Sequence, residues 1–77
     1  MSKSMYIEVR NLPIRLGQFL KLANLVQDGV EAKIRIQDGE VMVNSTVETR
    51  RGKQLMEGDT ITYNGKSRTV RIAPLFQ

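Results

Sequence analysis

The chain has 77 residues, with 12 Lys and Arg against 8 Asp and Glu, and a formal net charge of +4. It contains no cysteine and no histidine, which excludes disulfides, thiolate or imidazole zinc sites and a Ser-His-Asp catalytic group. A chain of this length forms one domain with a small core. We therefore expect a single domain over residues 1–77 that needs no cofactor or metal and is better suited to binding than to catalysis.

The apolar runs are only a few residues long, which is too short for a membrane span. The N-terminus also lacks the apolar core of a signal peptide. These features predict a cytoplasmic protein with no membrane partner.

Residues 5–10 alternate apolar and polar side chains, with Met5, Ile7 and Val9 on one face. This period of two predicts a half-buried strand. Pro13 ends the strand because it has no amide hydrogen and restricts the residue before it.

From residue 15 to about residue 26 the apolar period becomes that of a helix. The apolar positions at i, i+3, i+4 and i+7 are Leu16, Phe19, Leu20 and Ala23. The pattern predicts a first helix. On this helix Lys21 points nearly opposite the apolar stripe, and Arg15 lies at its edge.

A second helix is predicted between Asp28 and about Asp38. Asp28 can cap the free amides, with Glu31 reaching back as in a capping box. Gly39 is suited to the left-handed residue that follows a helix.

The core face of this second helix is formed by Ala32 and Ile36, which are four residues apart. Lys33 lies on an adjacent strip. Ile34 points away from both apolar residues, and the pattern leaves open whether it faces the core or an interface.

The rest of the chain is rich in β signals. The expected strands are residues 41–43, 46–49, 60–63 and 66–73. Asn64-Gly65 is a strong hairpin signal, and Asn44-Ser45 is a weaker one because Ser is less suited than Gly to the second position. Including the first strand and the two helices, the expected order is β-α-α-β-β-β-β.

The positive charge is concentrated in separate parts of the chain. Residues 1–27 and residues 64–77 each carry a net charge of +3, whereas residues 28–40 carry −2. Arg50, Arg51 and Lys53 surround Gly52, and arginine forks beside a flexible backbone match phosphate oxygens. On this local evidence alone, a solvated loop that only aids solubility is the favoured interpretation.

Other polar and aromatic residues give weaker signals. The four aromatic residues read as core or strand residues, so a base-stacking platform is not predicted; they are Tyr6, Phe19, Tyr63 and Phe76. Glu57 and Asp59 flank Gly58, which is typical of a β-turn, with Asp59 supporting it. A catalytic carboxylate pair would need a cleft that shifts one pKa, and a small core offers little room for one.

Four segments in register resemble the S4 RNA-binding domain, named after a protein of the small ribosomal subunit. They are Arg15-Leu16-Gly17-Gln18-Phe19-Leu20, Glu31-Ala32-Lys33, Gly39-Glu40-Val41-Met42-Val43-Asn44 and Gly58-Asp59-Thr60-Ile61. The resemblance covers residues 14–62 best. Residues 47–53 look like a subgroup of free-standing bacterial domains of about this length.

The resemblance implies an α+β fold in which an αα-hairpin, the αL motif, packs on a small, mainly antiparallel sheet. It also implies an RNA-facing surface formed by both helices and the following turn and loop. By position, the residues implied at that surface are Arg15, Lys21, Lys33, Asn44, Arg50, Arg51 and Lys53. Two departures are Ser45, where the family usually has glycine, and Asp28-Gly29-Val30, which lacks the Ser-Arg pair of many members.

The expected function is therefore that of a non-catalytic RNA-binding protein. The resemblance implies structured RNA, such as ribosomal or transfer RNA, as the partner, with association to the ribosome possible and no small-molecule substrate. The alternative is a protein–protein adaptor that uses the same surface on an acidic or ribosomal partner. An exposed Ile34 would favour this alternative, because apolar positions outside the core often mark contacts.

Overall fold

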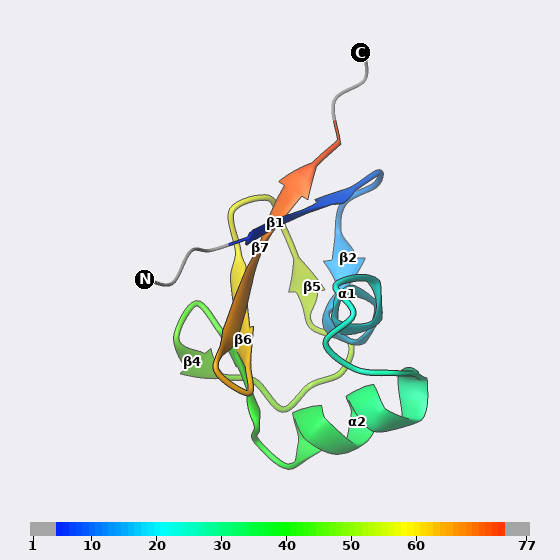
Figure 1. Cartoon of the computed structure of the whole chain (residues 1–77), viewed down its shortest axis with the longest axis vertical. Helices are drawn as coiled ribbons and strands as arrows, with labels where there is room; N and C mark the ends of the chain where they lie inside the picture. Colours follow the sequence, from blue (N-terminus) through cyan, green and yellow to red (C-terminus); the bar gives the residue numbers. More distant parts are fainter. Residues whose placement is uncertain (1–4, 74–77) are drawn as a thin grey trace.

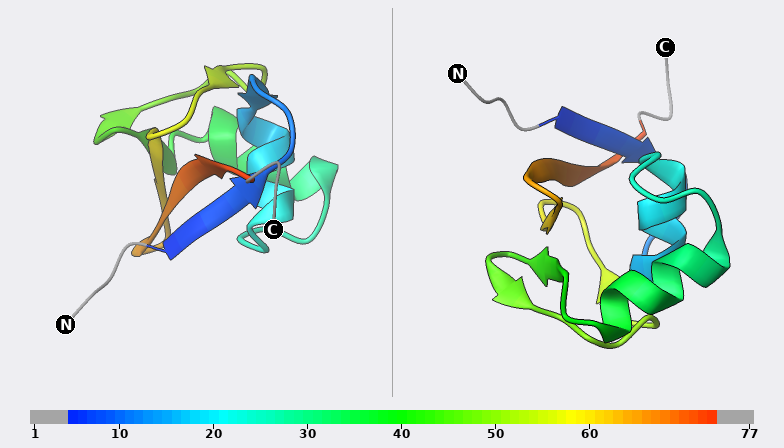
Figure 2. Two further views of the ribbon diagram at one scale, coloured as in Figure 1. Left: turned by 90° about the horizontal axis from the view of Figure 1, so that it is seen from above. Right: turned by 60° about the horizontal axis from the view of Figure 1, so that its bottom comes forward.

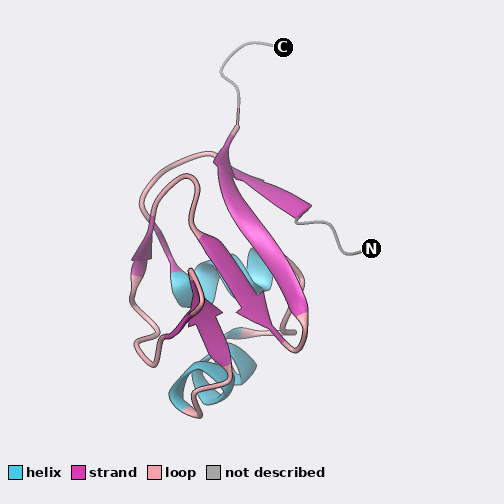
Figure 3. Ribbon diagram, turned by 90° about the vertical axis from the view of Figure 1, so that its left-hand side faces the viewer, coloured by secondary structure: helices cyan, strands magenta, loops and turns pink. Residues whose placement is uncertain are grey.

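A computed structural model describes residues 5–73 of the chain. Two helices lie on one side of a five-stranded sheet, and a second, two-stranded sheet lies beside the first helix (Figures 1 and 3). The elements are β1 (Met5–Val9), β2 (Ile14–Arg15), α1 (Leu16–Leu22), α2 (Gly29–Gln37), β3 (Val41–Val43), β4 (Thr46–Val47), β5 (Gln54–Leu55), β6 (Thr60–Tyr63) and β7 (Lys66–Ile72). Within this part of the chain, no helix is long and apolar enough to cross a membrane.

The predicted α+β class, with an αα-hairpin on a mainly antiparallel sheet, is confirmed. The predicted element order needs one correction, because two strands were missed. β2 and β5 pair antiparallel, with Ile14 opposite Leu55 and Arg15 opposite Gln54. Each has only two residues, which is too short for any alternation to be visible in the sequence. This pairing brings the chain after β4 back against the start of α1.

The larger sheet has the strand order β1-β7-β6-β3-β4. β1 runs parallel to β7, and the other neighbours are antiparallel. The predicted hairpin between β6 and β7 turns at Asn64 and Gly65, both with positive φ, as such a two-residue turn requires. The strand predicted over 46–49 is shorter, ending at Val47.

The buried core residues come from the helices and from the strands of the sheets. Figure 2 shows both helices on one side of the five-stranded sheet. The predicted stripe of α1 is buried along its length, and Ala32 and Ile36 of α2 meet it. From the strands, Val41, Leu55 and Ile61 complete the contact and are fully buried. These contacts hold both helices in one orientation, so that side chains on their outer faces have defined positions.

Helix α1 ends earlier than the periodicity suggested, at Leu22 rather than near Val26. Asn24 adopts a positive φ of 62°, and its amide donates to Lys21 O while the Leu25 amide donates to Leu20 O. This pair of bonds is the Schellman arrangement that closes a helix. Val26 is still buried, but it reaches the core from the connection and not from the helix.

Helix α2 has the predicted ends. The Asp28 carboxylate accepts a hydrogen bond from the Glu31 amide at 2.9 Å, and Gly39 follows the helix with a φ of 77°. Glu31 reaches one residue further back than a capping box requires, accepting from the Gln27 amide at 2.7 Å. These two hydrogen bonds fix the start of α2 at Gly29.

Candidate functional site

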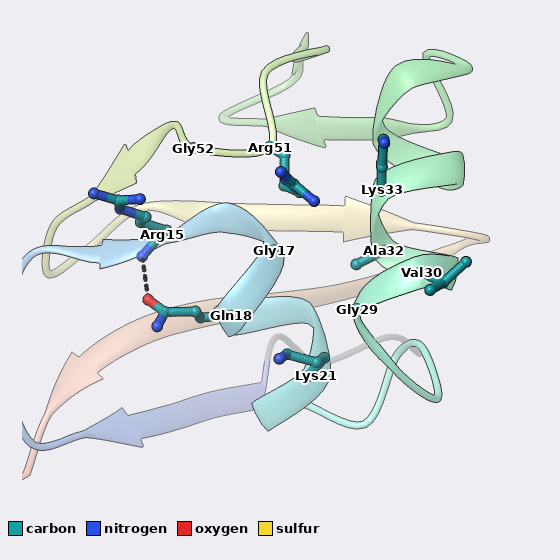
Figure 4. A pocket seen from close by; sticks show the side chains of 10 residues that line it. All are labelled: Arg15, Gly17, Gln18, Lys21, Gly29, Val30, Ala32, Lys33, Arg51 and Gly52. Carbon is teal, nitrogen blue, oxygen red and sulfur yellow. Dashed lines mark hydrogen bonds between the residues drawn. The ribbon is translucent and has the colours of Figure 1, made fainter.

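A groove of about 580 Å³ lies where the start of α1, the start of α2 and the loop after β4 meet. It brings together four of the seven residues implied at the surface, namely Arg15, Lys21, Lys33 and Arg51 (Figure 4). Arg15 is the N-cap residue of α1. Lys21 lies on α1 and Lys33 on α2. Arg51 reaches the groove from a segment far away in the sequence.

The position of Arg51 is set by backbone hydrogen bonds to the start of α1. The amide of Leu16 donates to Lys53 O at 2.8 Å, and the amide of Gly17 donates to Arg51 O at 3.1 Å. The first amides of a helix have no partner within the helix, and here the basic loop supplies two of those partners. The loop is therefore docked on α1 rather than free in solvent.

Gly17 allows this close approach. A Cβ atom built at Gly17 would lie 3.0 Å from Arg51 Cγ and 3.7 Å from Arg51 O. The sequence analysis did not single out Gly17 as a functional residue. A glycine inside a helix is unfavourable by about 1 kcal/mol relative to alanine, and that cost is the signal that could have indicated a packing role.

The groove is electropositive. Among the described residues that line it there is no carboxylate, and no ion pair within residues 5–73 involves its four cations. Gln18 and Val30 add a polar amide and an exposed apolar side chain to the lining. A surface of this kind matches a ligand that carries several negative charges.

The side chain of Arg50 lies outside the groove. Its guanidinium donates from Nε at 2.9 Å and from Nη2 at 3.2 Å to the Glu48 carboxylate, and it lines a neighbouring hollow together with Lys53. The hydrogen bond from the Arg50 side chain is the main cause that lowers the pKa of Glu48 to about 2. At neutral pH Glu48 is therefore ionised and offsets the charge of Arg50.

Asn44 lies outside the groove and binds within the protein. Its Oδ1 accepts from the Thr60 amide at 2.9 Å, and its Nδ2 donates to Asp59 Oδ1 at 3.0 Å. Asn44 and Ser45 both have positive φ, at 51° and 70°, so the turn keeps its geometry although Ser45 replaces the usual glycine. Lys53 lies beside Asn44 along a third depression.

Replacing Asn44 with glycine tests this structural role. Asn44→Gly keeps the left-handed turn but removes both side-chain hydrogen bonds, and it leaves the Thr60 amide unpaired. We compare it with Asn64→Gly, which changes the same residue at another positive-φ turn. The free energy of unfolding from urea titration should fall by about 1–2 kcal/mol more in the Asn44 variant. Equal values for the two variants would contradict the role.

The carboxylates at the β5–β6 turn support the fold, as the sequence predicted for Asp59. Asp59 accepts from the Met56 amide at 2.9 Å, and Glu57 accepts from the Ile72 amide at 3.2 Å. Within residues 5–73 there is no group of three or more acidic side chains that could hold a metal ion.

Two side chains with an apolar part are solvent-exposed. Ile34, whose environment the sequence left open, is 48% exposed on the outer face of α2, next to Val30 at 69%. Tyr6 was predicted to be a core or strand residue; it lies on the strand β1 and is 59% exposed, with the Arg71 guanidinium 5.3 Å from its ring centroid. Phe19 is fully buried, Tyr63 packs against the core, and Phe76 lies outside the described residues.

The helix pair, the sheet behind it and the basic groove together define an αL-type domain. The chain belongs to the S4 domain family, whose model matches residues 7–71.

Among its relatives, RlbA of Bacillus subtilis, named as a probable ribosome maturation protein, is 46% identical over 52 residues, or 68% of this chain and 73% of RlbA. YbcJ of Escherichia coli is 37% identical over 54 residues, or 70% of this chain and 77% of YbcJ. The solution structure of YbcJ aligns with a TM-score of 0.69 at 34% identity, covering 95% of this chain and 92% of YbcJ. That structure is described as revealing an αL motif involved in RNA binding.

Proposed function

We propose that this protein is a non-catalytic RNA-binding protein that recognises structured RNA through the basic groove. The observation that carries the proposal is the convergence of Arg15, Lys21, Lys33 and Arg51 on one concave surface. The names of the relatives support it, because YbcJ is described as having an αL motif involved in RNA binding and RlbA is named as a probable ribosome maturation protein. We extend the proposal to ribosomal RNA as the first RNA to test.

The groove suits a folded RNA because its cations are held on rigid elements. A-form RNA hides its base edges in a deep major groove, so proteins read it mainly through phosphates, 2′-hydroxyls and shape. Arg15 and Arg51 can each offer a forked set of donors to phosphate oxygens. Their fixed spacing relative to Lys21 and Lys33 would select the backbone geometry of a structured RNA over that of a free strand.

The salt dependence of binding tests the proposal directly. If the four groove cations each neutralise one phosphate, the logarithm of affinity should fall with the logarithm of salt at a slope of roughly −3 to −4. Lys33→Ala should reduce the size of that slope by about 1. Fluorescence anisotropy with ribosomal RNA fragments over a salt series measures both. A slope near zero would contradict the proposal.

The exposed Ile34 favours a second candidate function, that of an adaptor for a protein partner. Ile34 and Val30 are four residues apart on α2 and form an apolar strip beside the groove. Ribosome co-sedimentation distinguishes the two functions. Association that survives digestion of accessible RNA but is lost in the Ile34→Ser variant supports the adaptor. Association that is lost on digestion supports RNA binding.

A further inference from the structure

Another hollow, of about 790 Å³ and distinct from those beside Arg50 and Asn44, lies on the other side of α1. It is bounded by the end of β1, the turn that leads into β2 and the outer face of α1. Gln18 and Lys21 line this hollow as well as the basic groove. The two concave surfaces therefore meet along α1, with Lys21 between them.

The character of this hollow differs from that of the groove. Its lining includes apolar residues such as Pro13, Ile14 and the 53% exposed Leu22. It also includes two cations, Arg10 and Lys21, and one carboxylate, Glu8. No ion pair within residues 5–73 involves Arg10. The guanidinium of Arg10 is therefore available to a ligand.

A nucleotide has the complementary chemistry. Its base has two apolar faces that pack against apolar side chains or an arginine plane, and its phosphate is an anion. The volume is in the range of sites that take a small organic group. The groove, whose cations lie on fixed elements, suits a structured segment of RNA. An open hollow whose lining includes apolar side chains suits a base that is not paired.

From this geometry we infer that the hollow is a second RNA subsite, which binds an unpaired nucleotide adjoining the structured segment held in the groove. The inference rests on the proposed function and adds to it. The base packs on Leu22 and Pro13 under Arg10. Lys21 contacts the phosphate that connects the two segments. RNA therefore crosses α1 at its exposed face, and the preferred target is a helix with a single-stranded extension.

The test uses a blunt RNA hairpin and the same hairpin with a short oligoadenosine tail at its 5′ or its 3′ end. Binding to both is measured by fluorescence anisotropy at low salt, where the electrostatic part of affinity does not depend on sequence. The wild-type chain should bind one tailed hairpin about tenfold more tightly than the blunt one, which is the gain expected from one added charge-assisted hydrogen bond from Arg10. In the Arg10→Ala, Leu22→Ser double variant this advantage should disappear, with binding to the blunt hairpin unchanged.

Two further variants separate the subsite from general charge effects. Arg10→Lys keeps the charge but loses the planar group, so it should retain the salt slope and lose part of the tail advantage. Lys66→Ala removes a cation from β7, outside both surfaces, and should keep the full advantage. All the altered side chains are exposed, so each variant should fold. Circular dichroism is the measurement that checks this.

The outcomes distinguish this inference from the function it rests on. An equal tail advantage in wild type and double variant overturns the subsite, as does an equal loss on tailed and blunt hairpins, and the groove proposal stands in both cases. No salt-dependent binding of wild type to either hairpin overturns the proposed function and the subsite together. A tail advantage that only the Arg10 and Leu22 variants remove supports the subsite.

Discussion

The Lys33→Glu, Arg51→Glu double variant should bind structured RNA about a hundredfold more weakly than the wild-type chain while remaining folded. Each cation is expected to make a charge-assisted hydrogen bond worth at least about 1.5 kcal/mol, and the two losses together amount to about 3 kcal/mol. The reversed charges also repel phosphates within the groove. Neither side chain is buried, so the fold has little dependence on them.

The matched control for this variant is Lys66→Glu with Arg71→Glu. It makes the same change in net charge, but both residues lie on β7, outside the groove. If the groove is the binding surface, this control should lose far less affinity in the same anisotropy titration. Equal losses would mean that RNA responds only to net charge and that no particular surface is used. Thermal unfolding followed by circular dichroism shows whether each variant is folded.

Arg50 is omitted from the double variant for a structural reason. From the sequence its role could not be told apart from that of Arg51, since the two are consecutive arginines just before Gly52. In the structure the Glu48 carboxylate holds Arg50 in a neighbouring hollow, whereas Arg51 lines the groove and takes part in no ion pair within residues 5–73. Arg50 and Arg51 thus lie on different surfaces because only Arg50 is paired with a carboxylate. Periodicity and composition do not reveal that pairing.

Much of the fold follows from local signals in the sequence. Three such features are the apolar stripe of α1, the N-cap at Asp28 and the Asn64-Gly65 turn. Each depends only on residues that are close together in the sequence. What local signals cannot supply is pairing over long distances. The β2–β5 ladder joins residues about 40 positions apart, and the parallel pairing of β1 with β7 spans most of the chain.

The candidate site likewise combines features that the sequence predicts with features that only tertiary contacts establish. The resemblance implied seven surface residues, but their grouping depends on the docking of the 50–53 loop onto α1 through the amides of Leu16 and Gly17. Asn44 lies apart from the groove because Asp59 and the Thr60 amide bind its side chain. Residue type predicts which side chains can meet a phosphate, and tertiary hydrogen bonds decide which of them lie together on one surface.

The Gly17→Ala variant should bind structured RNA about tenfold more weakly although its only change is one methyl group. The new Cβ would meet Arg51 Cγ at 3.0 Å, so the arginine side chain must shift by a few tenths of an ångström. We expect this shift to cost the proposed hydrogen bond from Arg51 to a phosphate, which is worth about 1.5 kcal/mol. Stability should change by less than about 1 kcal/mol, because alanine restricts the unfolded chain more than glycine does. Anisotropy and urea titration measure the two effects separately.

Gly29→Ala is the matched control, since Gly29 also lines the groove near the start of a helix. A Cβ there meets only Lys21 Nζ, at 4.0 Å, which is an ordinary contact, so this variant should keep wild-type affinity. A double-mutant cycle with Arg51→Ala then tests whether the loss of affinity in Gly17→Ala arises through Arg51. If Gly17→Ala acts by displacing Arg51, it should cause no further loss in an Arg51→Ala background. If the losses of affinity from the two substitutions instead add, the methyl group acts by disturbing α1 itself. RNA binding then does not depend on the exact position of the Arg51 side chain.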